Sequence, residues 1–128
     1  MSVQPSFQVF LDTDDIINIL IYGKLNRKSI SEILNKVDPI VNGLTRHNKP
    51  ILVLADITHF TTSDLGARLY GSTHLKRRPV TKLAIVCRET TALLITKLLI
   101  RAAGKLNKTR FFSNGEAAML WLKNDRIP

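Results

Sequence analysis

The sequence predicts an α/β fold, with a mixed sheet of four to five strands flanked by about four α-helices. The 128 residues alternate strand-like and helix-like segments, which is the pattern of α/β proteins. The apolar run at residues 51–55 lies between Pro50 and Asp56, which is typical of a central strand covered on both faces. Helices between successive strands imply parallel crossovers, so we expect a mixed sheet.

The first segments predict a β-hairpin. Residues 7–11 place apolar side chains at alternating positions, and residues 16–22 are rich in isoleucine. The intervening residues 12–14 supply turn chemistry, and Gly23 ends the second strand where a positive φ or a bulge is needed.

A long helix is expected next. Ser29 and Glu32 have the spacing of a capping box, and apolar residues then recur at three and four residues as far as position 44. Pro39 lies inside this pattern, and a proline there removes a hydrogen bond and clashes with the preceding turn. The helix is therefore either kinked or restarted at Pro39.

The second half predicts two crossover helices and a C-terminal helix. Apolar spacing from Asp64 to position 75 indicates a helix capped by Thr62 or Ser63, and residues 81–87 form a fourth strand. A third helix is capped at residues 90–91 and ends at Gly104.

The remaining elements are a short edge strand and one more helix. Residues 109–112 form the strand. Ser113 and Glu116 repeat the capping-box spacing, which places the last helix directly after them.

Length and composition fit a single domain spanning residues 1–128 in the cytoplasm. No apolar run approaches the roughly 18 to 20 residues that span a bilayer, and residues 1–6 lack the features of a secretory signal. Cys87 is the only cysteine, which excludes an internal disulfide, and its apolar neighbours indicate a buried strand residue.

The charge is unevenly distributed. The formal net charge is +9, but residues 1–23 contain only acidic charges, so the remainder has nineteen basic residues against seven acidic ones, or +12. Such a surface attracts acidic proteins, nucleic acid or anionic lipid, although a solvated basic face is the simpler interpretation. The candidate basic face is formed by Lys76, Arg77, Arg78 and Lys82. We expect only weak, non-specific, salt-sensitive nucleic-acid binding.

The polar residues after the central strand form the candidate binding site. We expect a turn that leads from the strand into a helix N-terminus, where ligands gather and anions are favoured. Helix capping and turn bonding are the alternative roles of these side chains. The candidate binding residues are Asp56, Thr58, His59, Thr61, Thr62, Ser63 and Asp64. Either Thr62 or Ser63 is a candidate phosphoacceptor.

No catalytic, metal-binding or cofactor-binding motif is present. The glycines make neither a phosphate-binding loop nor a dinucleotide fingerprint, and the three histidines are not spaced as metal ligands. We therefore expect a protein that is not an enzyme and that has neither a cofactor nor a metal.

Four segments occur in a characteristic order. They are residues 22–26 (YGKLN), 52–67 (LVLADITHFTTSDLGA), 82–87 (KLAIVC) and 109–122 (TRFFSNGEAAMLWL). Their order and spacing resemble the STAS domain, the fold of the bacterial anti-sigma factor antagonists, and within it the SpoIIAA-like group. The resemblance covers almost the whole chain and implies a non-catalytic regulatory module.

The resemblance also implies a role for the predicted loop. In regulatory members this loop reads approximately Asp-Ser-Ser-Gly-Leu-Gly, and its first serine is phosphorylated by a partner kinase. The matching position here is Thr62, but Thr61 replaces the aspartate and Asp64 replaces the first glycine. We therefore expect function without phosphorylation.

Three modes of action follow. The leading one is protein interaction at the loop and adjoining helix, with a kinase-like protein or another signalling regulator as partner. The second is a carrier or sensor of a small hydrophobic or anionic ligand, similar to small lipid-binding domains, with a pocket under the second and third helices. The third is binding of nucleic acid or a membrane surface through the basic face. A homodimer is compatible with each of them.

Overall fold

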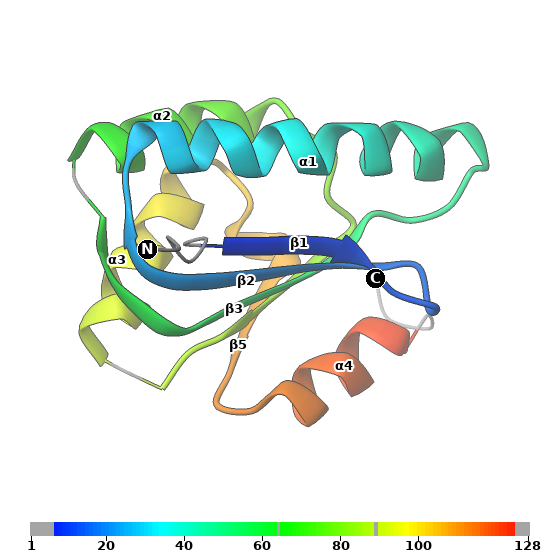
Figure 1. Ribbon diagram of the computed structural model, residues 1–128. Helices are drawn as coiled ribbons and strands as arrows, with labels where there is room; N and C mark the ends of the chain where they lie inside the picture. The colour runs from blue at the N-terminus through cyan, green and yellow to red at the C-terminus, as the bar shows by residue number, and fades with distance from the viewer. Residues whose placement is uncertain (1–6, 64, 89, 125–128) are drawn as a thin grey trace, which may run out of the picture.

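The computed structural model describes residues 7–63, 65–88 and 90–124, with only the backbone at 60–63, 65 and 90–92. Five strands and four α-helices alternate along these residues (Figure 1). The elements are β1 (Phe7–Leu11), β2 (Ile16–Leu25), α1 (Arg27–Arg46), β3 (Leu52–Ser63), α2 (Leu65–Lys76), β4 (Lys82–Val86), α3 (Thr90–Ala102), a 3₁₀ turn η1 (Leu106–Lys108), β5 (Thr109–Phe112) and α4 (Gly115–Lys123).

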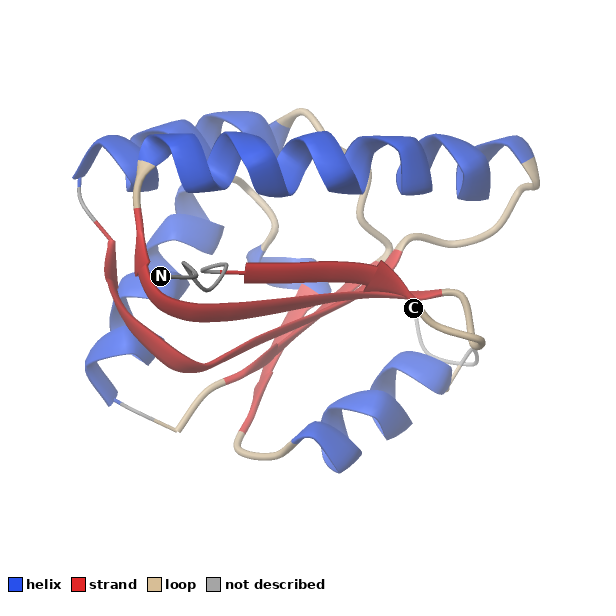
Figure 2. Ribbon diagram, viewed as in Figure 1, coloured by secondary structure: helices blue, strands red, loops and turns tan. Residues whose placement is uncertain are grey.

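The strands form one mixed sheet in the order β1-β2-β3-β4-β5. β1 and β2 are antiparallel, whereas β2, β3, β4 and β5 are parallel to their neighbours. Right-handed crossovers that step in one direction place their helices on the same face of the sheet. Accordingly α1, α2 and α3 share one face, and Figure 2 shows α4 across the sheet from α1 and α2. The predicted fold class is confirmed.

The N-terminal hairpin is confirmed, and Asp12 organises its turn. The Oδ1 atom of Asp12 accepts hydrogen bonds from the backbone N–H groups of Asp14 (2.9 Å) and Ile16 (3.0 Å). Its Oδ2 atom accepts from the side-chain amide of buried Asn18 at 2.9 Å. A short aspartate side chain satisfies turn amides in this way because it mimics a backbone carbonyl.

Helix α1 begins earlier than predicted. Asn26, not Ser29, is the N-cap, and its side-chain oxygen accepts from Ser29 N at 2.8 Å. The capping-box prediction is wrong because the helix begins at Arg27, so Ser29 lies inside its first turn. The helix also does not restart at Pro39 but continues through it. Its buried apolar face packs on the sheet, which offsets the proline penalty of about 3 kcal/mol.

The C-terminal elements follow the predicted order. Gly104 adopts φ 72°, the left-handed conformation expected after α3, and β5 forms the edge of the sheet. Helix α4 is capped by Asn114, whose side chain accepts from Ala117 N at 2.9 Å, so the predicted cap at Ser113 is wrong. The caps predicted for α3 lie outside the described side chains.

Candidate functional site

Strand β3 continues where a polar turn was predicted. It reaches Ser63, so the prediction of a turn after Asp56 is wrong. β4 ends opposite Asp56, but β2 stays paired with β3 through two register shifts as far as Leu25, opposite Ser63. Threonine favours strands as a β-branched residue, and the long β2 supplies the hydrogen-bonding partner. Helix α2 then begins at Leu65, one residue after the predicted start.

The predicted binding residues as far as Ser63 therefore lie along strand β3 and not in a turn. The Oδ1 atom of half-buried Asp56 accepts from the backbone N–H of Thr58 at 2.9 Å, so this carboxylate bonds the local backbone. His59 is exposed, and its ring stacks on Tyr22 with centroids 6.2 Å apart. The side chains of residues 61–63, and the whole of residue 64, lie outside the described part. Their capping, binding and phosphoacceptor roles stay predictions.

The four residues of the predicted basic face have different environments. Lys76 and Arg77 are exposed, whereas Arg78 is half-buried in an ion pair. Lys82 is buried, and its Nζ donates to the carbonyl oxygens of Trp121 (3.0 Å) and Asn124. These carbonyls lie at the C-terminus of α4, where a cation is favoured by the helix dipole. The placement of Lys82 on an exposed face is therefore wrong.

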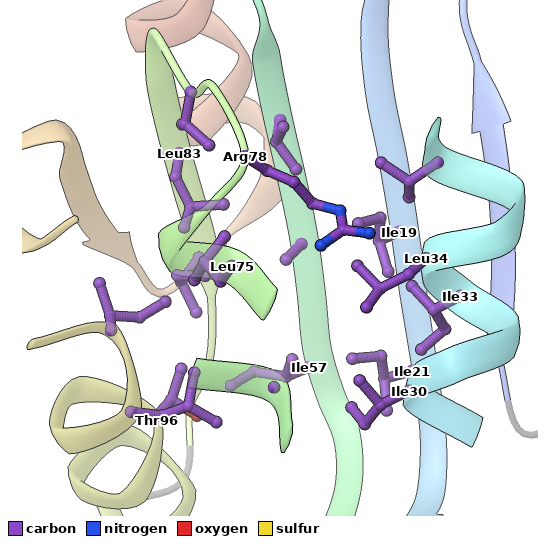
Figure 3. A pocket seen from close by; sticks show the side chains of 18 of the residues that line it. Ile19, Ile21, Ile30, Ile33, Leu34, Ile57, Leu75, Arg78, Leu83 and Thr96 are labelled. Carbon is purple, nitrogen blue, oxygen red and sulfur yellow. The ribbon is translucent and has the colours of Figure 1, made fainter. Parts of the chain in front are cut away.

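A cavity of about 210 Å³ lies between the sheet and helices α1, α2 and α3. Figure 3 shows its wall of aliphatic side chains, including Ile19 and Ile21 of β2, Ile33 of α1 and Ile57 of β3. The polar side chains in the lining are those of Arg68, Arg78 and Thr96. The cavity is thus an apolar space with a few polar groups in its wall.

Small residues on α2 account for this space. Ala67 and Gly71 lie on the side of the helix that lines the cavity. A Cβ atom added at Gly71 would meet the Cδ1 atom of Leu99 at 3.7 Å, an ordinary contact distance. At Ala67 and Gly71 the helix therefore leaves part of the gap above the sheet unfilled.

Arg78 is fixed in the cavity wall by two segments of the chain. Its Nε and Nη2 atoms donate to the two carboxylate oxygens of Asp38 on α1, both at 2.8 Å. Its Nη1 atom donates to the carbonyl oxygen of His74 at 2.8 Å. Hydrogen bonding and the charge of Arg78 lower the pKa of Asp38, while the same pair raises the pKa of Arg78. Burial opposes both shifts.

Sequence reasoning did not identify this ion pair. Asp38 and Arg78 are 40 residues apart in the sequence. The local pattern around each residue does not indicate a contact between them. The small residues Ala67 and Gly71 were the available signal for the cavity, but they acquire meaning only when α2 is placed over the sheet.

Across the ranges described, no three His, Cys, Asp or Glu side chains form a group that could hold a metal ion. No helix in those ranges is both long and apolar enough to cross a membrane.

The fold is SpoIIAA-like. An uncharacterized protein of the DUF3478 family from Shewanella loihica PV-4, with a SpoIIAA-like fold, has a TM-score of 0.63 at 20% identity, over 95% of this chain and 98% of that one. The unphosphorylated anti-sigma factor antagonist SpoIIAA has a TM-score of 0.55 at 10% identity, over 89% of this chain and 94% of that one. At these identities the likeness shows the fold.

The family is given by the sequence. Residues 34–126 match the family model described as "Domain of unknown function (DUF7793)", and the chain belongs to this family. No curated protein matches the sequence.

Proposed function

We propose that the chain is a non-catalytic binding module of the STAS type that carries or senses a small apolar molecule. The observation that carries this proposal is the cavity of about 210 Å³ between the three helices and the sheet. Protein interiors are close-packed, so an apolar space of this size between packed helices and a sheet is unusual. An aliphatic cavity of about 150 Å³ already binds benzene, and burial of apolar surface contributes roughly 25 cal/mol per Å².

The chemistry of the lining supports binding over catalysis. A catalytic pocket needs a nucleophile or an acid–base pair that points at a bound substrate. The polar side chains of this lining are two arginines and Thr96, which can orient a ligand but do not form such a pair. The non-catalytic role fits the regulatory character that the resemblance to STAS domains implies.

A pair of substitutions at Gly71 tests the proposal. Gly71→Leu places a side chain in the cavity and should abolish binding of 1-octanol, measured by isothermal titration calorimetry. Gly71→Ala is the matched control and should keep binding, since its Cβ has room beside Leu99. Equal octanol binding by the wild type and folded Gly71→Leu protein, or none by the wild type, would refute a ligand site in the cavity.

Protein interaction at the β3–α2 junction is the second candidate function. The observation that favours it is an exposed leucine in the helix that follows the junction, since Leu69 of α2 is 60% exposed. The neighbouring α3 also exposes Leu94 and Leu98. Exposed leucines on packed helices offer an apolar contact surface to a signalling protein.

Intact-mass analysis of protein purified from its own host tests the regulatory part of this candidate. We expect no stoichiometric phosphate on Thr62 or Ser63, because Thr61 and Asp64 replace the residues that flank the phosphorylated serine. Phosphate on either residue, together with partner binding that switches when it is removed, would restore a phosphoswitch. Thr62→Ala and Ser63→Ala are expected to leave the fold intact, at a cost of about 1 kcal/mol if the hydroxyl caps α2.

A further inference from the structure

The guanidinium of Arg78 has hydrogen-bonding capacity left over. An arginine side chain has five N–H donors, and the bonds to Asp38 and the His74 carbonyl use three of them. In the hydrogen bonding shown for the described residues, one N–H therefore remains on Nη1 and one on Nη2. These two terminal nitrogens are the pair that binds a carboxylate in a two-pronged contact.

Arg78 lies in the loop after α2, beside the cavity. Its side chain is only 22% exposed and belongs to the cavity wall. Figure 3 shows it reaching from the end of α2 into the space bordered by Ile19 and Leu34. Because Asp38 and the His74 carbonyl hold the guanidinium in place, little conformational entropy remains to be lost when a ligand binds.

The surrounding charge favours an anion. Asp38 balances the charge of Arg78, but the exposed Lys76 and Arg77 directly precede it. The local surplus is therefore positive, and a positive field attracts an acidic group toward the mouth. The rest of the wall offers an aliphatic chain a dry surface.

We propose that the ligand of the cavity is a single-chain carboxylate amphiphile, such as a medium-chain fatty acid. Its carboxylate accepts hydrogen bonds from the terminal nitrogens of Arg78, and its chain lies among the isoleucines of β2, β3 and α1. This assignment rests on the proposed ligand-binding function. The volume of about 210 Å³ lies below the usual range for drug-sized ligands, roughly 300–1,000 Å³, and therefore favours one short chain over a two-chain lipid.

Calorimetric titrations with octanoate and 1-octanol at neutral pH test the assignment, because the two probes share a chain and differ in the head group. The wild type should bind octanoate about tenfold more tightly than octanol, as expected for a charge-assisted hydrogen bond. Arg78→Met should remove this preference and change octanol affinity less than threefold. Asp38→Asn keeps an amide oxygen that can accept from Arg78 and so hold the guanidinium, but it removes the competing negative charge. It should tighten octanoate binding severalfold and leave octanol binding unchanged.

The outcomes separate the two proposals. If octanol binds the wild type as tightly as octanoate, or if the preference survives in Arg78→Met, the head-group assignment is wrong while the cavity proposal stands. If octanoate binds equally to wild type and folded Gly71→Leu, the anion is held by the basic surface and the assignment also fails. If neither probe binds the wild type, both proposals fail. Asp38→Asn keeps the test decisive should Arg78→Met not fold, since an unchanged octanoate affinity contradicts the assignment.

Discussion

The face of the sheet under α4 buries its contact residues almost completely, whereas the opposite face borders an apolar cavity. Under α4, Ala84 and Ala118 are fully buried and Leu122 is only 1% exposed. Under α1, α2 and α3, aliphatic side chains surround about 210 Å³ of space. Both faces bury apolar surface, but the second also borders an apolar cavity between its helices and the sheet.

The difference has a steric origin. A single short helix can lie close to the sheet, because Ala118 allows a close approach and Leu122 packs against Ile16 and its neighbours. Three helices that share the other face must also pack against one another, and the small residues Ala67 and Gly71 of α2 do not fill the space between them. We infer that side-chain packing on the α4 face mainly stabilises the fold. On the three-helix face, looser packing leaves space in which a ligand can bind.

Truncation of a leucine on each face gives the largest expected effect. Leu122→Ala should lower the free energy of unfolding by about 2–5 kcal/mol, because a fully buried side chain leaves a cavity. Leu99→Ala should cost less, since this side chain is partly buried and borders space that is already empty. Urea unfolding of both variants measures the difference, and an equal loss of stability would contradict the contrast between the faces.

Enlarging an alanine on each face gives the next largest effect. Ala118→Val should destabilise by about 1–3 kcal/mol, because the added methyl groups have no room. Ala67→Val, the matched change on a helix that lines the cavity, should cost less than Ala118→Val, because Ala67 is as deeply buried but borders the cavity. Thermal unfolding compares the pair. A larger loss in Ala67→Val would show that the space beside α2 is not available to a side chain.

Gly71→Ala is expected to stabilise the protein. Alanine is preferred to glycine inside a helix by up to about 1 kcal/mol, and the added Cβ makes only an ordinary contact with Leu99. Chemical denaturation should therefore show a small rise in the free energy of unfolding. A loss of stability instead would mean that α2 lies closer to α3 than the cavity requires.

The ion pair on the cavity face should make stability fall in acid. The pKa of Asp38 is lowered by Arg78, so its contribution is present above the ordinary value of 3.8 and is lost as the pH falls through the lower folded value. The contribution is at most about 1 kcal/mol, because Asp38 is 42% exposed. Between pH 5 and strongly acidic pH, wild type should lose more stability than Asp38→Asn. Parallel pH curves would contradict this assignment.

Local sequence patterns predicted most of the fold. Alternating apolar residues identified the hairpin, three-and-four spacing identified the helices, and Gly104 marked the end of α3 because the left-handed conformation there suits glycine. The residues that cap the helices were predicted less reliably. Asn26 and Ser29 both have capping side chains within three residues, and the choice between them depended on where the chain leaves β2.

The candidate site depended more on the tertiary structure. The residues after Asp56 are small and polar, which suited a turn, but pairing with the long β2 made them a strand. Lys82 is charged, yet carbonyl oxygens at the end of α4 allow it to be buried.

The sequence by itself determined the order and type of the elements, because periodicity and turn chemistry act over a few neighbouring residues. It also determined the family, since residues 34–126 match that family's model. The sequence left a pocket under the second and third helices as one alternative, and only the tertiary structure decided the walls of the cavity and the contact between Asp38 and Arg78. Both depend on how closely helices from distant parts of the chain approach the sheet, and that distance is set by packing over the whole molecule.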